Sequence, residues 1–268
     1  VEHRTALSAR SRSLCSCSFL ALILSLWVVS GPAWAQERPG EPFDRDLLLK
    51  RAGDLAGAPF VEPGRLGRGA TLSYDQYRGI RFRPAASIWA RENRTFTVDL
   101  LYPGFIFETP VNIHLVVGGT ARRVDFTNQV FDFAPDVPQL DETADAGYSG
   151  FRVRAPVNRE DYLDEFLVFQ GASYFRAVAR GQLYGISARG LAVSTGQPAG
   201  EEFPLFTDFW IERPAAAAKR FIVHALLQSR SVVGAYKFTV VPGDDTVIDV
   251  VAPLFPRADL RAFGIAPL

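Results

Sequence analysis

One short segment of this sequence places carboxylates and an indole ring at alternate positions. Asp208, Trp210 and Glu212 follow one another at a spacing of two, and the side chains of a β-strand point alternately to its two faces. These three side chains therefore share one face of the predicted strand. The opposite face, which we expect to pack in the core, carries Thr207, Phe209 and Ile211.

This combination of residue types is suited to sugars, because aromatic rings stack on their C–H faces and carboxylates bind their hydroxyls. Hydrolysis of a glycosidic bond requires two carboxyl groups, about 5–5.5 Å apart for retention or about 6.5–9.5 Å apart for inversion. Four strand residues separate the Cα atoms of Asp208 and Glu212 by about 13 Å. A catalytic pair would need a partner from another strand or from outside this chain. A plain solvated sheet face is the alternative.

Further candidates for contact with a ligand surround this segment. Tyr174 and Arg176 share a face of an earlier predicted strand, and Arg189 lies on the next one. Glu201 and Glu202 come just before the strand that carries the acidic and aromatic face. Burial of the two arginines in structural ion pairs is the competing interpretation.

Other chemistries find little support. His114 and His224 each lie inside an apolar β pattern without a second ligand at metal-binding spacing, so a packed or surface histidine is favoured over a metal site. A Ser-His-Asp triad stays open, although no G-x-S-x-G elbow is present. Nothing predicts a cofactor. The full chain of 268 residues has a net charge of zero, which gives no reason to expect nucleic acid as a partner.

The elements that must position these residues are almost all β-strands. One helix is expected after Asp44, ending at Gly57. Short runs with period-2 alternation and turn signals between them then predict an all-β sandwich or barrel. These runs are 95–101, 111–117, 121–126, 150–155, 166–170, 173–179, 185–193, 206–212, 219–227, 235–241 and 245–252. Gly118-Gly119, 180–182 and 242–244 are expected hairpin turns.

Residues 1–35 have the organisation of a secretory signal peptide. A basic segment precedes an apolar run over 19–29, and Ala33-Trp34-Ala35 forms a cleavage signal. Cleavage there leaves 36–268, with 26 basic and 28 acidic side chains and a net charge of −2. Both cysteines leave with the signal, which excludes thiol chemistry and disulfides in the exported part. No later run is long and apolar enough to predict a transmembrane segment.

Several long motifs are distributed over the sequence. They are the segments 72–78 (LSYDQYR), 80–82 (IRF), 103–105 (PGF), 150–153 (GFRV), 171–177 (GASYFRA), 184–192 (YGISARGLA), 200–204 (GEEFP), 209–214 (FWIERP), 234–236 (GAY) and 264–268 (GIAPL). In these motifs the sequence resembles the periplasmic glucan biosynthesis proteins of the MdoG/OpgG and OpgD type. The resemblance covers nearly all of residues 43–268.

This resemblance implies a periplasmic protein that acts in the synthesis of osmoregulated periplasmic glucans, which are β-linked glucose polymers. It implies a large β-sandwich similar to the galactose mutarotase-like fold of sugar-active proteins, followed by a smaller immunoglobulin-like domain. Some relatives hydrolyse β-1,2-glucan through acidic residues. Family members continue well beyond Leu268, so we expect residues 36–268 to be an incomplete N-terminal sandwich that lacks the second domain.

No catalytic residue of the hydrolytic relatives can be carried onto this chain, because their acid and base are expected beyond Leu268. The residues expected to contact a β-glucan chain lie in the matching motifs and are Asp75, Tyr174, Arg176, Arg189, Glu201, Glu202, Asp208 and Trp210. Two functions remain open, a carbohydrate-active enzyme and a non-catalytic glucan-binding partner of a membrane glucan synthase. An exported β-sandwich with an unrelated role is a third.

Overall fold

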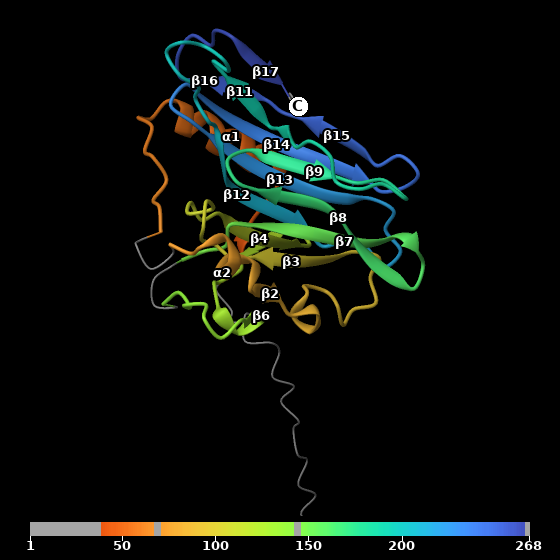
Figure 1. Cartoon of the computed structure of the whole chain (residues 1–268). Helices are drawn as coiled ribbons and strands as arrows, with labels where there is room; N and C mark the ends of the chain where they lie inside the picture. The colour runs from red at the N-terminus through yellow and green to blue at the C-terminus, as the bar shows by residue number, and fades with distance from the viewer. Residues whose placement is uncertain (1–38, 67–70, 142–145, 266–268) are drawn as a thin grey trace, which may run out of the picture. The chain divides into compact units, whose positions relative to one another are not determined.

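The computed structural model describes residues 39–66, 71–141 and 146–265. The expected signal peptide, with its cleavage signal, lies outside these residues. Two large sheets and two small ones make up most of the described chain (Figure 1). The prediction of an all-β fold with one short N-terminal helix is confirmed.

The larger sheet has eight strands and runs in the order β1-β5-β4-β12-β13-β14-β15, with β16 pairing on β14. All neighbours are antiparallel except β4 and β12, which are parallel and bring distant parts of the chain together. The strand bounds are β1 Glu41–Pro42, β4 Asn112–Val117, β5 Thr120–Arg123, β12 Leu205–Glu212, β13 Phe221–Gln228, β14 Val232–Val241, β15 Val247–Val251 and β16 Leu254–Pro256. The expected hairpin turns at Gly118-Gly119 and 242–244 join β4 to β5 and β14 to β15.

The second sheet has five antiparallel strands in the order β10-β9-β8-β7-β3. Its strands are β3 Thr97–Leu101, β7 Gly150–Arg159, β8 Tyr162–Gln170, β9 Tyr174–Ala177 and β10 Ala188–Arg189. Two small sheets pair β2 Ile80–Phe82 with β6 Phe131–Phe133, and β11 Leu191–Val193 with β17 Phe263–Ile265. Short 3-10 helices occupy Pro84–Ala86 and Asn128–Val130.

The two large sheets pack face to face through phenylalanine rings. Phe169 on β8 contacts Phe206, Phe209 and Phe238 of the eight-stranded sheet, with ring centroids 5.0–6.3 Å apart. Rings at such distances and tilted orientations contribute beyond the area they bury. The predicted sandwich is therefore present, and its core accounts for the high phenylalanine content of the sequence.

The single long helix, α1 (Arg45–Ala56), forms as predicted. The Asp44 carboxylate caps it by accepting a hydrogen bond from the Leu47 backbone N–H at 2.8 Å, and Gly57 ends it. Its buried side chains, Leu48 and Ala52, belong to a second apolar cluster on the outer face of the eight-stranded sheet. The other buried members of this cluster are Val116, Ala121, Trp210, Leu226, Val233 and Ala235.

Several short elements were not predicted, because they are too brief to show a period. Helix α2 (Tyr74–Arg78) is one turn long and is held by a capping box, in which the Ser73 hydroxyl accepts from the Gln76 N–H and the Gln76 side chain accepts from the Ser73 N–H. The strands missed are β1, β2, β6, β16 and β17.

The predicted strand over 185–193 is wrong in its extent. Residues 178–187 form a loop, and the remainder is divided into β10 and β11 at Gly190. A Cβ at Gly190 would lie 2.6 Å from the Phe206 ring, so only glycine allows the backbone to approach the core this closely.

The core face predicted for β12 also needs correction. A β-bulge at Thr207 shifts the register between Phe206 and Asp208. Phe206 therefore joins Phe209 and Ile211 in the core, and Thr207 does not. A bulge adds one residue to one strand and re-aims the side chains that precede it, which simple alternation cannot anticipate.

Candidate functional site

The acidic and aromatic face of β12 is covered by α1 instead of forming an open surface. Asp208 is 3% exposed and Trp210 is 5% exposed. The Trp210 ring is stacked between the rings of Phe43 and His114, each with its centroid 5.2 Å away, and Arg51 of α1 lies over it. The sequence left two interpretations of this face open, glucan contact and a solvated surface. Both require the face to be uncovered, but α1 covers it.

Asp208 instead anchors α1 and β4 to the sheet. Asn112 donates to it at 3.1 Å, Thr207 donates at 2.8 Å, and the Arg51 guanidinium lies 3.6 Å away. Burial alone would raise the pKa of Asp208, but His114, the charge of Arg51 and the Thr207 hydroxyl outweigh it and hold this pKa below its ordinary value. The carboxylate is a structural ion in this position.

The lowered pKa of Asp208 predicts a pH dependence of stability. Its contribution is complete above the unfolded-state pKa of about 3.9 and is lost as the pH falls through the lower folded-state value. We expect the free energy of unfolding to fall less steeply between pH 6 and pH 3 in Asp208→Asn than in the unmodified chain. Urea unfolding at several pH values measures this, and equal pH slopes in the two chains would refute the assignment.

The other carboxylates of the predicted face are divided among separate contacts. Glu212 pairs with His224 at 2.7 Å, and this hydrogen bond lowers its pKa despite partial burial. Glu202 accepts from the Ser231 N–H at 3.0 Å and from its hydroxyl at 2.9 Å, tying its loop to the β13–β14 turn. Burial opposes the effect, but hydrogen bonds from Ser229 and Ser231 hold the pKa of Glu202 below its usual range.

Tyr174, Arg189 and Glu201 lie together, and Arg189 forms the structural ion pair that was the competing interpretation for it. Arg189 forms an ion pair with Glu201, and its guanidinium lies over the Tyr174 ring at 5.3 Å from the centroid. Thr195 donates to the same carboxylate at 3.0 Å. Arg189 thus has an acidic partner, and its main contribution is to hold the Tyr174 ring in place.

A groove opens beside Tyr174 at the turn between β8 and β9. It encloses about 380 Å³. We call it the β8–β9 groove; it is lined by Ile106, Phe107, Val168, Gln170, Gly171, Ala172, Tyr174, Phe175, Arg176 and Ser187. Both Tyr174 and Arg176, which the alternation placed on one face, contribute to it. Apolar walls with a few fixed polar groups are typical of small-molecule sites.

An aromatic cluster extends this groove toward α2. Tyr74 and Tyr77 contact the Phe105 ring at 5.8 and 6.1 Å, and Tyr77 contacts Phe107 at 5.8 Å. Tyr74 is 57% exposed, so one ring is open to a ligand while the others support it. Asp75, the remaining predicted site residue, lies in the first turn of α2 next to Tyr74 and is exposed.

The polar end of the groove is fixed by hydrogen bonds. The Gln170 side-chain amide donates to the Tyr77 hydroxyl at 2.8 Å and to the Ser149 hydroxyl at 2.9 Å. Tyr77 in turn donates to the Tyr102 carbonyl at 2.9 Å. Burial raises the pKa of Tyr77, so its hydroxyl stays a donor at all ordinary pH values. This chain of contacts leaves the Gln170 carbonyl oriented by its neighbours.

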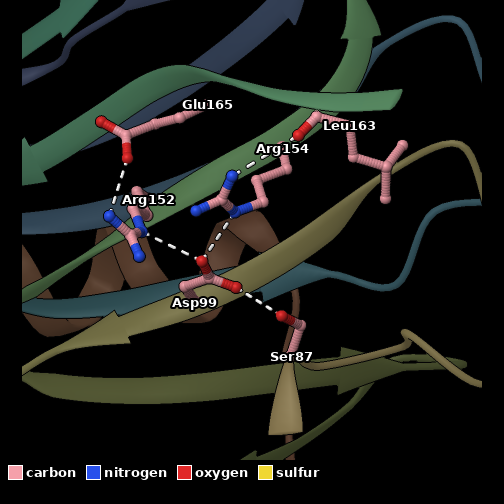
Figure 2. A network of polar contacts seen from close by, with 6 residues as sticks. All are labelled: Ser87, Asp99, Arg152, Arg154, Leu163 and Glu165. Carbon is pink, nitrogen blue, oxygen red and sulfur yellow. Dashed lines mark hydrogen bonds and ion pairs between the residues drawn. The ribbon is translucent and has the colours of Figure 1, made fainter. Parts of the chain in front are cut away.

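An ionic network lies on the same outer face of the five-stranded sheet (Figure 2). Asp99, which is 1% exposed, accepts hydrogen bonds from Arg152 at 3.0 Å, from Arg154 at 2.7 Å and from Ser87 at 2.5 Å. Arg152 also donates to Glu165 at 2.8 Å. Figure 2 shows both guanidinium groups at one oxygen of Asp99 and the Ser87 hydroxyl at the other. Because its oxygens accept these three hydrogen bonds, the Asp99 carboxylate has a structural role.

The network and the groove are connected by strand register. Asp99 pairs with Arg152, Arg152 with Val168, and Val168 with Arg176, which forms one row across four strands. This row starts at the buried Asp99 and ends at the groove. The candidate site is therefore the outer face of the five-stranded sheet. The aromatic rings lie at the groove, and Arg152 and Arg176 lie along the row.

Most of these contributors were missed in the sequence. Arg152 and Arg154 alternate with the core residues Phe151 and Val153, which is the same period-2 signal that drew attention to residues 208–212. Asp99 stands between two apolar strand residues in the same way. Phe105 and Phe107 flank no regular element, and only the fold brings them to α2.

Comparison with known proteins identifies the family. The family model described as periplasmic glucan biosynthesis protein, MdoG, matches residues 43–268. The chain belongs to this family. A protein named glucans biosynthesis protein G from Rhodopseudomonas palustris is 46% identical over 251 residues, covering 93% of this chain and 50% of that protein.

Relatives from other bacteria agree. Proteins with the same name from Shewanella frigidimarina and Vibrio cholerae are 48% and 45% identical, and each match covers 84% of this chain. These matches cover 41% and 42% of the two relatives. The chain thus spans about half the length of the curated relatives it matches. The segments 72–78, 103–105 and 171–177, on which the resemblance described above partly rests, lie within the matched range.

Within the part of the chain that the structure describes, no helix has the length and apolar character needed to cross a bilayer. Those same residues include no group of three or more metal-binding side chains.

Proposed function

We propose that this chain acts in the periplasm in the biosynthesis of osmoregulated periplasmic glucans, and that it binds a β-1,2-linked glucose chain on the outer face of its five-stranded sheet. Membership of the periplasmic glucan biosynthesis family supports the process and the compartment. The signal peptide predicted over residues 1–35 is consistent with export.

The observation that carries this proposal is the meeting of family motifs at the β8–β9 groove. Tyr74, Phe105 and Tyr174 come from three separate segments, and each lies in a motif of the family. Rings of this kind stack on the apolar faces of sugars, while Gln170 and Ser187 in the groove can pair with hydroxyls. Arg189 keeps the Tyr174 ring in position.

Replacing Tyr174 with alanine tests the groove directly. We expect Tyr174→Ala to weaken the binding of a linear β-1,2-glucooligosaccharide about tenfold, which corresponds to the loss of one ring contact of ~1.4 kcal/mol. Tyr174→Phe keeps the ring and should retain most of the affinity. Isothermal titration calorimetry measures both dissociation constants.

Tyr162 provides the matched control for this experiment. It is 56% exposed and lies at the start of β8, opposite Arg159 and away from the groove residues. Tyr162→Ala should bind the oligosaccharide as the unmodified chain does. Equal affinities of Tyr174→Ala and Tyr162→Ala would refute glucan binding in the groove.

A non-catalytic glucan-binding partner of a membrane glucan synthase is the second candidate, and one feature of this face agrees with it. Its carboxylates Asp99 and Glu165 both pair with Arg152, so neither is placed to deliver a proton to a glycosidic oxygen. We expect the purified chain to leave linear β-1,2-glucan at its initial length. Shortening of the glucan, followed by chromatography, would instead support the enzyme hypothesis.

A further inference from the structure

Arg176 differs from the other arginines of the candidate site in having no acidic partner. Arg152 and Arg154 both pair with Asp99, and Arg189 pairs with Glu201. Among the residues that the structure describes, no carboxylate lies within ion-pair distance of Arg176. The four guanidinium groups of the candidate site thus face three carboxylates, Asp99, Glu165 and Glu201, and the guanidinium without an ion pair is that of Arg176.

This unpaired charge lies in the β8–β9 groove. Arg176 is the one charged side chain among the described residues that line it; the others are apolar, aromatic or neutral polar. Arg176 is itself exposed, so an anion can reach its guanidinium from solvent. The planar guanidinium also presents several N–H donors in one plane, which match the oxygens of a carboxylate or phosphate.

The Tyr184 ring contacts this guanidinium. The Arg176 Cζ lies 5.1 Å from the centroid of the Tyr184 ring, a cation–π distance. The preceding loop residues are fixed to the β7–β8 hairpin, where Arg180 donates to the Val157 carbonyl at 2.8 Å and the Gly181 N–H donates to Asn158 at 2.7 Å. These contacts hold the start of the loop that carries Tyr184.

We infer that Arg176 recognises an anionic group, a carboxylate or a phosphate ester, carried by the sugar chain in the groove, and that Tyr184 positions it. This inference rests on the proposed function, since the sugar chain is the ligand proposed there. The uncharged parts of the groove bind neutral glucose units, and Arg176 adds a preference for units that bear a negative charge. Arg176 is a specificity-determining residue in this scheme, and Tyr184 is a positioning residue.

Paired oligosaccharides test this preference. Isothermal titration calorimetry compares a neutral β-linked glucooligosaccharide with one of equal length that ends in a glucuronic acid unit. We expect the acidic sugar to bind about tenfold tighter, in line with one charge-assisted hydrogen-bonded contact. Arg176→Gln should reduce the ratio of the two affinities to about one, because glutamine carries no charge to pair with the acidic unit. Arg122→Gln, which removes an exposed charge from β5, is the matched control.

Variants of Tyr184 separate positioning from folding. Tyr184→Phe keeps the ring and should keep the preference for the acidic sugar. Tyr184→Ala should lose most of this preference, and Tyr184→Phe is then the conservative variant that rescues it. Both variants change a loop residue, so we expect each to fold, and circular dichroism checks this.

The outcomes are distinguishable. Equal binding of acidic and neutral sugars by the unmodified chain, or a preference that survives Arg176→Gln, overturns the inference and leaves the proposed function standing. Binding of inorganic phosphate alone that depends on Arg176 supports the anion site and identifies a free anion as its ligand. If phosphate binds in this way and no neutral sugar binds, the proposed function fails while the anion site remains.

Discussion

Asp99→Asn will lower the free energy of unfolding of this protein by about 3 kcal/mol. Asp99 is buried and takes hydrogen bonds from Arg152, Arg154 and Ser87. Asparagine has the same shape but no charge. Arg154, which is about three-quarters buried, therefore loses its paired carboxylate, and the equally buried Arg152 keeps only Glu165. Removing one partner of a buried ion pair lowers stability by more than the intact pair adds to it, because the remaining charge stays buried without a partner. Urea unfolding followed by fluorescence gives the difference.

Asp161→Asn is the control for this measurement. Asp161 pairs with Arg159 at 2.8 Å, but both side chains are mostly exposed. Exposed pairs of this kind contribute little to stability, since water screens the charges. If Asp99→Asn cost no more than Asp161→Asn, the Asp99 network would not stabilise the five-stranded sheet.

Trp210→Ala tests whether Trp210, like Tyr174, contributes to glucan binding, as the sequence analysis expected of both residues. Trp210 is buried between Phe43 and His114 beneath α1, so its truncation leaves a cavity under the helix. We expect a loss of about 3–5 kcal/mol in the free energy of unfolding, the range for large aromatic residues in cores. Affinity for the β-1,2-glucooligosaccharide should stay unchanged, because the ring does not line the β8–β9 groove.

Trp210→Phe keeps a smaller ring and protects the experiment against complete unfolding. It should show a reduced stability loss and the same unchanged affinity. Tyr174→Ala should give the reverse pattern, with lost affinity and little change in stability. A loss of glucan affinity in folded Trp210→Phe would restore Trp210 as a ligand contact and would contradict the cover by α1.

The fold was predictable from the sequence to a large extent, because alternation over five to ten residues is a strong signal. Strands such as β7, β12 and β14 follow clear apolar patterns, and the glycine pairs and Pro-Gly turns mark the hairpins. The helix after Asp44 also follows from its cap and its apolar spacing. Elements of two or three residues, such as β1 and β17, carry no period and could not be found.

The candidate site was predictable only in part, since alternation shows which residues share a face but not what covers that face. The alternation of β12 determines the face on which Asp208 and Trp210 lie. Whether that face is buried depends on α1, which lies far earlier in the chain. Tyr174 and Arg176 were placed correctly together. Their neighbours Phe105 and Tyr74 join them only through packing between distant segments.

The parallel pairing of β4 with β12 sets an order of events for folding. The β7–β8 and β13–β14 hairpins join strands close in sequence, so their loops close at little entropic cost. The contact between Asn112 and Asp208 closes a loop of almost a hundred residues that contains the whole of β7, β8 and β9. We expect the hairpins to form first and the larger sheet to complete itself around them as the slow step.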